Sequence, residues 1–167
     1  MKKVIITGGT GLVGQRLTTL LKHKGFEVNI LCRNPKRPNE FKWNIDEHYI
    51  DERVFEQASA IIHLAGAGVA EKRWTEERKK EIIESRTKSA RLLYKYLSGS
   101  KYPVASFISA SAVGFYGDRK SELLTEDSAN GSGFLAEVCK VWEEEAEKFS
   151  ALNIAVSKIR IGIVLSK

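Results

Sequence analysis

Near its start the chain reads Val4-Ile5-Ile6-Thr7-Gly8-Gly9-Thr10-Gly11-Leu12-Val13-Gly14, a β-branched run followed by three regularly spaced glycines. Apolar residues then recur at helical spacing, so the stretch predicts a strand, a tight turn and a helix. Gly8 permits backbone angles that a side chain forbids, Gly11 lets a pyrophosphate approach the main chain, and Gly14 lets the helix pack closely against the strand. The free amides and the dipole at the helix N-terminus would then face the phosphates. The stretch therefore predicts a dinucleotide cradle.

The overall composition fits one soluble globular domain, residues 1–167. Hydrophobic residues make up 43% and charged residues 29%, which is ordinary for such a domain. The net charge is +6, but the basic residues are spread along the chain and mixed with acidic ones. This distribution argues against nucleic-acid binding. No apolar run approaches the ~18 residues of a membrane span. The cysteines Cys32 and Cys139, and a strand that begins almost at Met1, favour a cytoplasmic protein with reduced thiols.

Strands alternate with helices along the chain. Apolar and β-branched runs predict strands at residues 4–7, 27–32, 41–44, 60–66, 104–111 and 154–161. Amphipathic stretches predict helices at residues 12–24, 76–97 and 131–150, with a short helical turn at 52–57. Such alternation is typical of a parallel sheet whose right-handed crossovers place helices on both faces. We therefore predict a three-layer, doubly wound, Rossmann-type α/β fold.

The end of the second predicted strand bears on the choice of cofactor. NAD-preferring folds often carry an acidic residue there for the ribose hydroxyls. This chain instead has Arg33 at that end and its acid, Glu27, at the other. Arg33, with Lys36 or Arg37, would pair with a 2′-phosphate, although a solvated surface arginine is the alternative interpretation. The sequence therefore favours NADP over NAD.

The fourth predicted strand closes in Leu64-Ala65-Gly66. Small side chains at this end leave room for an adenine or a ribose beside the backbone. His63 comes directly before them, and no neighbour in the sequence forms a catalytic dyad with it. We interpret His63 as a packed strand residue rather than a catalyst.

Further motifs extend the pattern over nearly the whole chain. They are Leu64-Ala65-Gly66, Lys72-Arg73-Trp74, Glu84-Ser85-Arg86, the run from Ser109 to Gly117, Thr125-Glu126-Asp127, Phe134-Leu135-Ala136, Cys139 and Trp142-Glu143. Together with the Gly-x-x-Gly-x-x-Gly turn, they resemble an epimerase-like family of the extended short-chain dehydrogenase/reductase superfamily, the family that includes SDR39U1 and YfcH-type proteins. The resemblance implies an NADP-binding fold. It also implies a C-terminal substrate-binding part that lies beyond the length of this chain.

The catalytic residues are where the chain departs from the superfamily. In the superfamily a serine at the end of this strand polarises a substrate carbonyl, and a Tyr-x-x-x-Lys pair on the next helix supplies acid and base. The resemblance places Ser111 in the serine position, where bonding to the backbone is the alternative role. It places Leu135 and Cys139 in the tyrosine and lysine positions, and Lys140 is turned by ~100° from the latter. Tyr116, in the loop after Ser111, is the candidate acid, with packing over the cofactor as the alternative.

The predicted cofactor site combines the glycine turn with neighbouring strand ends. Ser85 stands where extended members often carry an asparagine, and Ser109 lies on the serine-rich strand. The predicted cofactor-binding residues are Gly8, Thr10, Gly11, Leu12, Val13, Gly14, Arg33, Leu64, Ala65, Gly66, Ser85 and Ser109. We predict no metal site.

The sequence leaves two functions open. The leading hypothesis is an NADP-dependent oxidoreductase or epimerase acting on a small carbonyl or sugar-like substrate, with Ser111 orienting the substrate and Tyr116 as the acid. The alternative is an NADP-binding sensor or regulatory module without turnover, because the Tyr-x-x-x-Lys pair is missing. Extended members can dimerise through two long helices, so a homodimer is one expectation. The substrate is not predicted.

Overall fold

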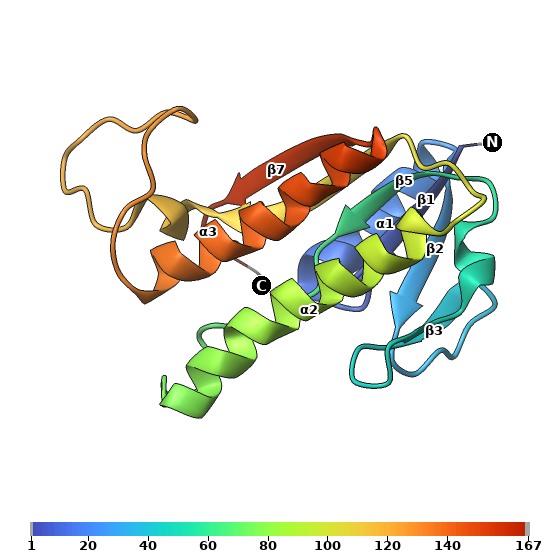
Figure 1. Ribbon diagram of the computed structural model, residues 1–167, viewed down its shortest axis with the longest axis horizontal. Helices are drawn as coiled ribbons and strands as arrows, with labels where there is room; N and C mark the ends of the chain where they lie inside the picture. Colours follow the sequence, from blue (N-terminus) through green and yellow to red (C-terminus); the bar gives the residue numbers. More distant parts are fainter. Residues whose placement is uncertain (1, 166–167) are drawn as a thin grey trace.

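The computed structural model describes residues 2–165 and contains one seven-stranded sheet (Figure 1). The strands are β1 (Lys3–Thr7), β2 (Glu27–Cys32), β3 (Glu40–Asn44), β4 (Tyr49–Ile50), β5 (Ala58–His63), β6 (Ser106–Ala112) and β7 (Ala155–Ile161). Their order is β4-β3-β2-β1-β5-β6-β7, and β4 alone runs antiparallel to its neighbour. The chain moves outward from β1 to β4 and then returns to β5. The switch point of this doubly wound sheet therefore lies between β1 and β5, where such sheets bind ligands at the carboxyl ends of the strands.

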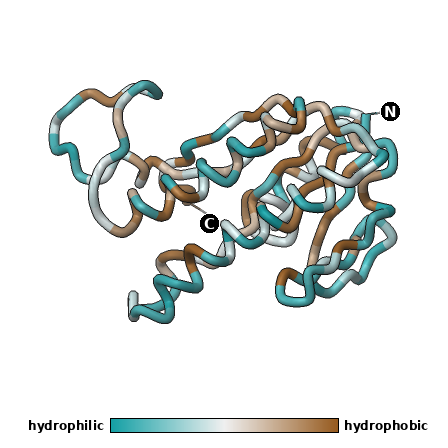
Figure 2. Tube along the Cα trace, in the orientation of Figure 1, coloured by the Kyte–Doolittle hydropathy of each residue, from teal (hydrophilic) through white to brown (hydrophobic). Residues whose placement is uncertain are grey.

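Helices cover both faces of the sheet. They are α1 (Leu12–His23), α2 (Glu76–Ser98) and α3 (Phe134–Glu147), with short 3₁₀ segments η1 (Glu52–Phe55), η2 (Val113–Tyr116) and η3 (Lys148–Leu152). Successive strand residues point to opposite faces. Accordingly Ile5 of β1 joins the core beneath α2 and α3, whereas its neighbours Val4 and Ile6 join a smaller core beneath α1. Hydrophobic residues concentrate where these layers meet, and the outer turns of the helices are polar (Figure 2).

The longest helix, α2, begins where the sequence predicts. The Thr75 hydroxyl oxygen accepts a hydrogen bond from the Arg78 amide at 3.2 Å, and Glu76 and Glu77 occupy the first turn. Negative side chains at this end suit the helix dipole. No helix within residues 2–165 is both long enough and apolar enough to cross a bilayer.

The predicted Rossmann-type fold is confirmed, and several element bounds differ from the prediction. The strand β4 was not predicted, because two residues carry too little pattern; a turn with His48 at a φ of 53° folds it back on β3. The last helix begins at Phe134 rather than at residue 131, because Gly133 has a φ of 98° outside the helical range. The fourth predicted strand ends at His63 rather than at residue 66. The Leu64 amide still donates to the Thr7 backbone oxygen at 3.2 Å, and the Leu64 and Ala65 amides both bond to the Thr7 side chain.

Candidate functional site

The glycine turn between β1 and α1 is tightly packed at Gly8 and Gly14, whereas little protein lies near Gly11. Gly8 has a φ of +70°, and a Cβ there would lie 2.9 Å from the carbonyl carbon of Leu64. A Cβ on Gly14 would collide with the Gly8 carbonyl oxygen and lie 2.6 Å from the Cα of Gly9. A Cβ on Gly11, in contrast, would meet only the Gly8 oxygen, at 3.4 Å. The first and third glycines thus allow close packing, and the second leaves the outer side of the turn free.

The N-terminus of α1 is free to bind an anion. Its N-cap residue, Gly11, has no side chain to cap the helix, and the first turn carries no acidic residue. Helical bonding starts with the Gln15 amide, which donates to the Gly11 oxygen at 2.9 Å, so the amides of the three residues between them have no partner within the helix. Leu12 and Val13 are exposed at this end. Unpaired amides and the positive end of the helix dipole fit the diphosphate of a dinucleotide.

The chain after β5 packs against this turn through the side chain of Thr7. Leu64 and Ala65 each donate a backbone hydrogen bond to the Thr7 hydroxyl oxygen at 3.2 Å. These bonds place the two amides beside Gly8, and Gly66 follows as an exposed residue. The residues 64–66 therefore form a wall next to the glycine turn, and Thr7 fixes its position.

A chain of hydrogen bonds runs inward from Thr7 through His63 to α2. The Thr7 hydroxyl lies 2.7 Å from His63 Nδ1, and the Ser89 hydroxyl lies 3.1 Å from His63 Nε2. Ser89 itself donates to the Arg86 carbonyl oxygen at 2.9 Å. Since the Thr7 oxygen already accepts two amides and the Ser89 hydrogen is committed, the imidazole must accept at Nδ1 and donate at Nε2. We call Thr7, His63 and Ser89 the histidine relay.

The relay holds His63 in its neutral form. Burial of the ring lowers the pKa of His63 to about 4, and the Arg86 charge acts in the same direction, against a hydrogen bond to the Arg86 backbone. A protonated ring would present a second N–H to a Thr7 oxygen that already accepts two amides. His63 is thus a packed strand residue, as the sequence indicates, and it also orients the wall.

Arg33 follows β2 and is exposed. No ion pair involving Arg33 occurs within residues 2–165. Arg37, in contrast, pairs with the buried carboxylate of Glu40 at 3.8 Å, and Glu27 at the other end of β2 pairs with Lys3 at 3.2 Å. Arg33 and the exposed Lys36 are therefore the cations near this strand end that form no ion pair within residues 2–165.

Ser111 and Tyr116 belong to one buried network built around Glu143 of α3. Ser111 donates to Glu143 Oε1 at 2.6 Å, and Arg160 of β7 donates to both carboxylate oxygens at 2.9 Å. Another Arg160 nitrogen donates to the Tyr116 phenol oxygen at 2.8 Å. We call these four residues the Ser111 network.

The charges of the Ser111 network are balanced inside the protein. Burial acts to raise the pKa of Glu143, but the hydrogen bonds from Arg160 and Ser111 outweigh it and hold the pKa below its ordinary value. The same carboxylate raises the pKa of Arg160. The structure thus brings the two predicted catalytic residues together, with Arg160 and Glu143 as partners.

The position aligned with the catalytic lysine is buried. Cys139 is enclosed, and burial raises the pKa of its thiol, with a smaller opposing effect of the Arg86 charge. Lys140 is exposed and lies 4.0 Å from Glu144. Leu135 is half-buried at the start of α3. Within residues 2–165 a buried thiol, and not a lysine ammonium, therefore occupies this position.

Two of the predicted cofactor residues are bonded within the protein. The Ser85 hydroxyl accepts from the Ala67 amide at 2.9 Å and donates to the Ile82 oxygen at 3.0 Å. The buried Ser109 hydroxyl donates to the Ala110 oxygen at 2.9 Å. These serines shape the walls of the site, and their contact with a cofactor stays a prediction.

An open glycine turn at the switch point of a doubly wound sheet defines a Rossmann protein of the class that binds nicotinamide dinucleotides. The sequence profile described as the NAD dependent epimerase/dehydratase family matches residues 4–135. The chain belongs to this family.

Relatives and solved structures agree with this assignment. The epimerase family protein YfhF of Bacillus subtilis is 33% identical over 170 residues, which cover 98% of this chain and 55% of YfhF. A structure described as the nucleoside-diphosphate sugar epimerase of Corynebacterium glutamicum is 38% identical with a TM-score of 0.84, covering 99% of this chain and 34% of that one. The human epimerase family protein SDR39U1 (isoform 2) with NADPH is 26% identical with a TM-score of 0.80, covering 99% of this chain and 55% of that one. The chain thus spans about half the length of the curated relatives it matches.

Proposed function

We propose that this chain is the NADP-binding part of an epimerase-like short-chain dehydrogenase/reductase, an oxidoreductase or epimerase acting on a small carbonyl or sugar-like substrate. The observation that carries the proposal is the uncapped N-terminus of α1 behind the open side of Gly11. Membership of the NAD dependent epimerase/dehydratase family supports it. A bound nicotinamide would supply hydride transfer, and the residues of the chain supply binding and orientation.

The preference for NADP over NAD rests on Arg33. Its guanidinium is exposed and free of carboxylate partners among the described residues, and the acids nearby are already paired. An arginine suits a 2′-phosphate because its planar fork matches phosphate oxygens. The NADPH bound by the human relative agrees with this choice.

Of the two candidate catalytic residues, Tyr116 is the better placed as an acid. Its phenol oxygen accepts a hydrogen bond from Arg160, which leaves the phenol proton free to be donated. The Ser111 proton is directed at Glu143 instead. For Ser111 to polarise a substrate carbonyl, its hydroxyl must turn away from that carboxylate. Ser111 would then orient the substrate and Tyr116 would protonate it.

Substitution of Gly11 by aspartate tests the cradle without endangering the fold. Gly11 has a φ of −79°, which any residue can adopt, and aspartate is a favoured N-cap. We expect Gly11→Asp to unfold no more easily than the unaltered chain, yet to weaken NADPH binding in calorimetry by at least about tenfold, or ~1.4 kcal/mol. The neutral cap in Gly11→Asn should lose less affinity. Undiminished NADPH affinity in Gly11→Asp would contradict the proposal.

A cofactor-binding module without turnover is the second candidate function, and one observation favours it. Leu135 and Cys139 hold the places of the acid–base pair. In that case NADPH at ~100 times its dissociation constant would still stabilise the fold by ~2.7 kcal/mol. Stabilisation with no oxidation of NADPH across a panel of carbonyl and nucleotide-sugar substrates would favour the module. Substrate-dependent oxidation would favour the enzyme.

A further inference from the structure

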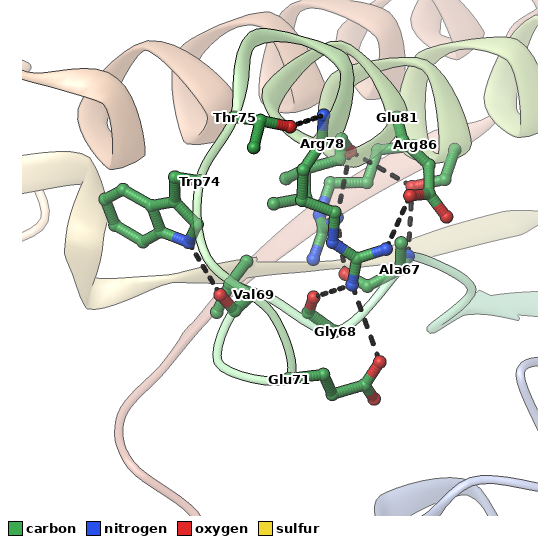
Figure 3. Close-up of polar contacts among 11 residues, drawn as sticks. Ala67, Gly68, Val69, Glu71, Trp74, Thr75, Arg78, Glu81 and Arg86 are labelled. Carbon is green, nitrogen blue, oxygen red and sulfur yellow. Dashed lines mark hydrogen bonds and ion pairs between the residues drawn. The ribbon is translucent and has the colours of Figure 1, made fainter.

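Arg86 is a buried arginine whose bonding capacity is only partly used. It projects from α2 beneath the loop that follows β5 and is 9% exposed (Figure 3). Its Nη1 donates to the carbonyl oxygens of Ala67 at 3.0 Å and Ile82 at 2.9 Å. Its Nε is buried without a hydrogen-bond partner in residues 2–165. The guanidinium carbon lies 4.9 Å from the centre of the Trp142 ring.

No carboxylate balances the charge of Arg86 in the part of the chain that the structure describes. Other arginines do have such partners: Arg91 pairs with Glu145 at 2.6 Å and Arg160 with Glu143 at 2.9 Å across the fold, and Arg78 pairs with Glu81 at 2.6 Å on the same helix. A buried cation held only by carbonyl dipoles and an aromatic face is costly to the folded chain. Because burying the Arg86 charge in this way destabilises the folded chain, we expect the guanidinium to bind a ligand.

Arg86 lies between the loop that follows β5 and helix α3, at the carboxyl edge of the sheet. On one side is Gly66, where a Cβ would lie 3.0 Å from the guanidinium carbon and 3.2 Å from Nε. On the other side is α3, where the centre of the Trp142 ring lies 4.9 Å from the guanidinium carbon, three residues along the helix from Cys139. Gly66 belongs to the wall beside the dinucleotide cradle. The absence of a side chain there leaves the guanidinium covered by backbone alone.

We propose that Arg86 is a ligand-binding cation of this site, which donates a hydrogen bond to an acceptor oxygen in the nicotinamide half of the dinucleotide. The inference rests on the proposed NADP function. Arg86 extends from α2 toward the part of α3 that contains Cys139. At that position this chain has an uncharged thiol in place of the lysine. The charge of Arg86 is not neutralised, and its Nη2, unlike the enclosed Nε, makes no hydrogen bond to the described residues. Arg86 therefore supplies the cation that α3 does not provide.

A comparison of NADPH with a fragment that lacks the nicotinamide half distinguishes a ligand-binding role of Arg86 from a purely structural one. Adenosine 2′,5′-bisphosphate carries the adenine and the 2′-phosphate but no nicotinamide ribose. We expect Arg86→Gln to weaken NADPH binding at least about tenfold in calorimetry and to leave the bisphosphate affinity within about twofold. Arg86→Lys keeps the charge and should retain an intermediate NADPH affinity. Lys88→Gln, which removes an exposed charge from the same helix, should change neither affinity.

Each other outcome has a definite meaning. Equal NADPH affinity in Arg86→Gln and the unaltered chain would overturn the role of Arg86 alone. Parallel losses for NADPH and the bisphosphate, together with a lower free energy of unfolding, would assign Arg86 to structure. If Arg86→Gln does not fold, Arg86→Lys decides, since undiminished NADPH affinity combined with full stability would then overturn the inference. Failure of the unaltered chain to bind NADPH would overturn the proposed function as well.

Discussion

The glycine turn and the Ser111 network lie at the same edge of the sheet but use their polar groups in opposite ways. At the turn, the amides at the start of α1 have no partner within the helix and no side-chain cap, and the relay behind them contains only neutral groups. In the network, Glu143 is bonded to Ser111 and Arg160, and Arg160 is bonded to Tyr116. An anionic ligand can therefore meet the turn without breaking any bond. A ligand that reaches Ser111 must compete with a buried carboxylate.

This contrast separates binding from catalysis. The binding surface is made of backbone, whose geometry is set by glycines and by the relay, so it is ready before a ligand arrives. The candidate catalytic groups are side chains that support one another. The predictions below test this separation by breaking one region at a time.

The largest expected effect comes from breaking the Ser111 network. Glu143→Gln removes the charge that balances the largely buried Arg160, and such a loss costs about 3–5 kcal/mol in the free energy of unfolding. The NADPH affinity of the folded fraction should change little, because Glu143 has no contact with the glycine turn. Urea unfolding and calorimetry measure the two quantities. The control Glu144→Gln removes an exposed carboxylate 4.0 Å from Lys140 and should cost less than about 1 kcal/mol. Equal costs for the two variants would mean that the network adds no stability.

The free energy of unfolding should fall as the pH is lowered, because the folded chain holds His63 in its neutral form. A histidine that gains a carboxylate partner would have the opposite effect. The folded pKa of His63 is about 4, below its ordinary value of 6.5, so between these values the unfolded chain binds more protons. Stability is therefore lost as the pH falls through this window, by about 3 kcal/mol in all. In urea unfolding from pH 7.5 to 4, the advantage of the unaltered chain over His63→Gln should shrink by that amount. A difference that stays constant over this pH range would contradict the lowered pKa of the buried His63 ring.

A smaller effect is expected where the relay meets the wall. Thr7→Val keeps the shape of the side chain but removes the acceptor of the Ala65 amide and one of the two acceptors of the Leu64 amide, which should cost about 2 kcal/mol. Unlike Glu143→Gln, it should also weaken NADPH binding, because the wall is no longer fixed beside Gly8. The matched control is Thr19→Val on the exposed face of α1, which should stay within about 0.5 kcal/mol. Undisturbed NADPH affinity in Thr7→Val would show that the wall holds its place without the threonine.

The two regions also differ in how far the sequence predicts them. The order of strand, glycine turn and helix was predicted because its signals are local: Gly8, Gly11 and Gly14 lie within seven consecutive residues. The Ser111 network joins residues that are 32 positions apart in one bond and 17 in another, and the relay spans 56 and 26. No periodic pattern links such residues, so Ser111 and Tyr116 were placed by resemblance, and their partners were not predicted. Arg86 was visible in the sequence only as part of a motif, because its lack of a carboxylate partner within residues 2–165 is a property of the fold.

The smallest expected effect concerns affinity alone and tests the adenine side of the cradle. Arg33 is exposed and contributes to no ion pair in residues 2–165, so Arg33→Gln should leave the free energy of unfolding unchanged. If Arg33 contacts the 2′-phosphate, NADPH affinity should fall by about tenfold, or ~1.4 kcal/mol, while NADH affinity stays constant. The matched control is Arg37→Gln, since Arg37 is already paired with Glu40 at 3.8 Å and should not discriminate between the cofactors. Calorimetric titration of both cofactors at two salt concentrations measures the effect, and the loss should shrink at the higher salt because the contact is exposed. An equal loss for NADH and NADPH would assign Arg33 to the general potential of the cradle and leave the choice of NADP without a residue to explain it.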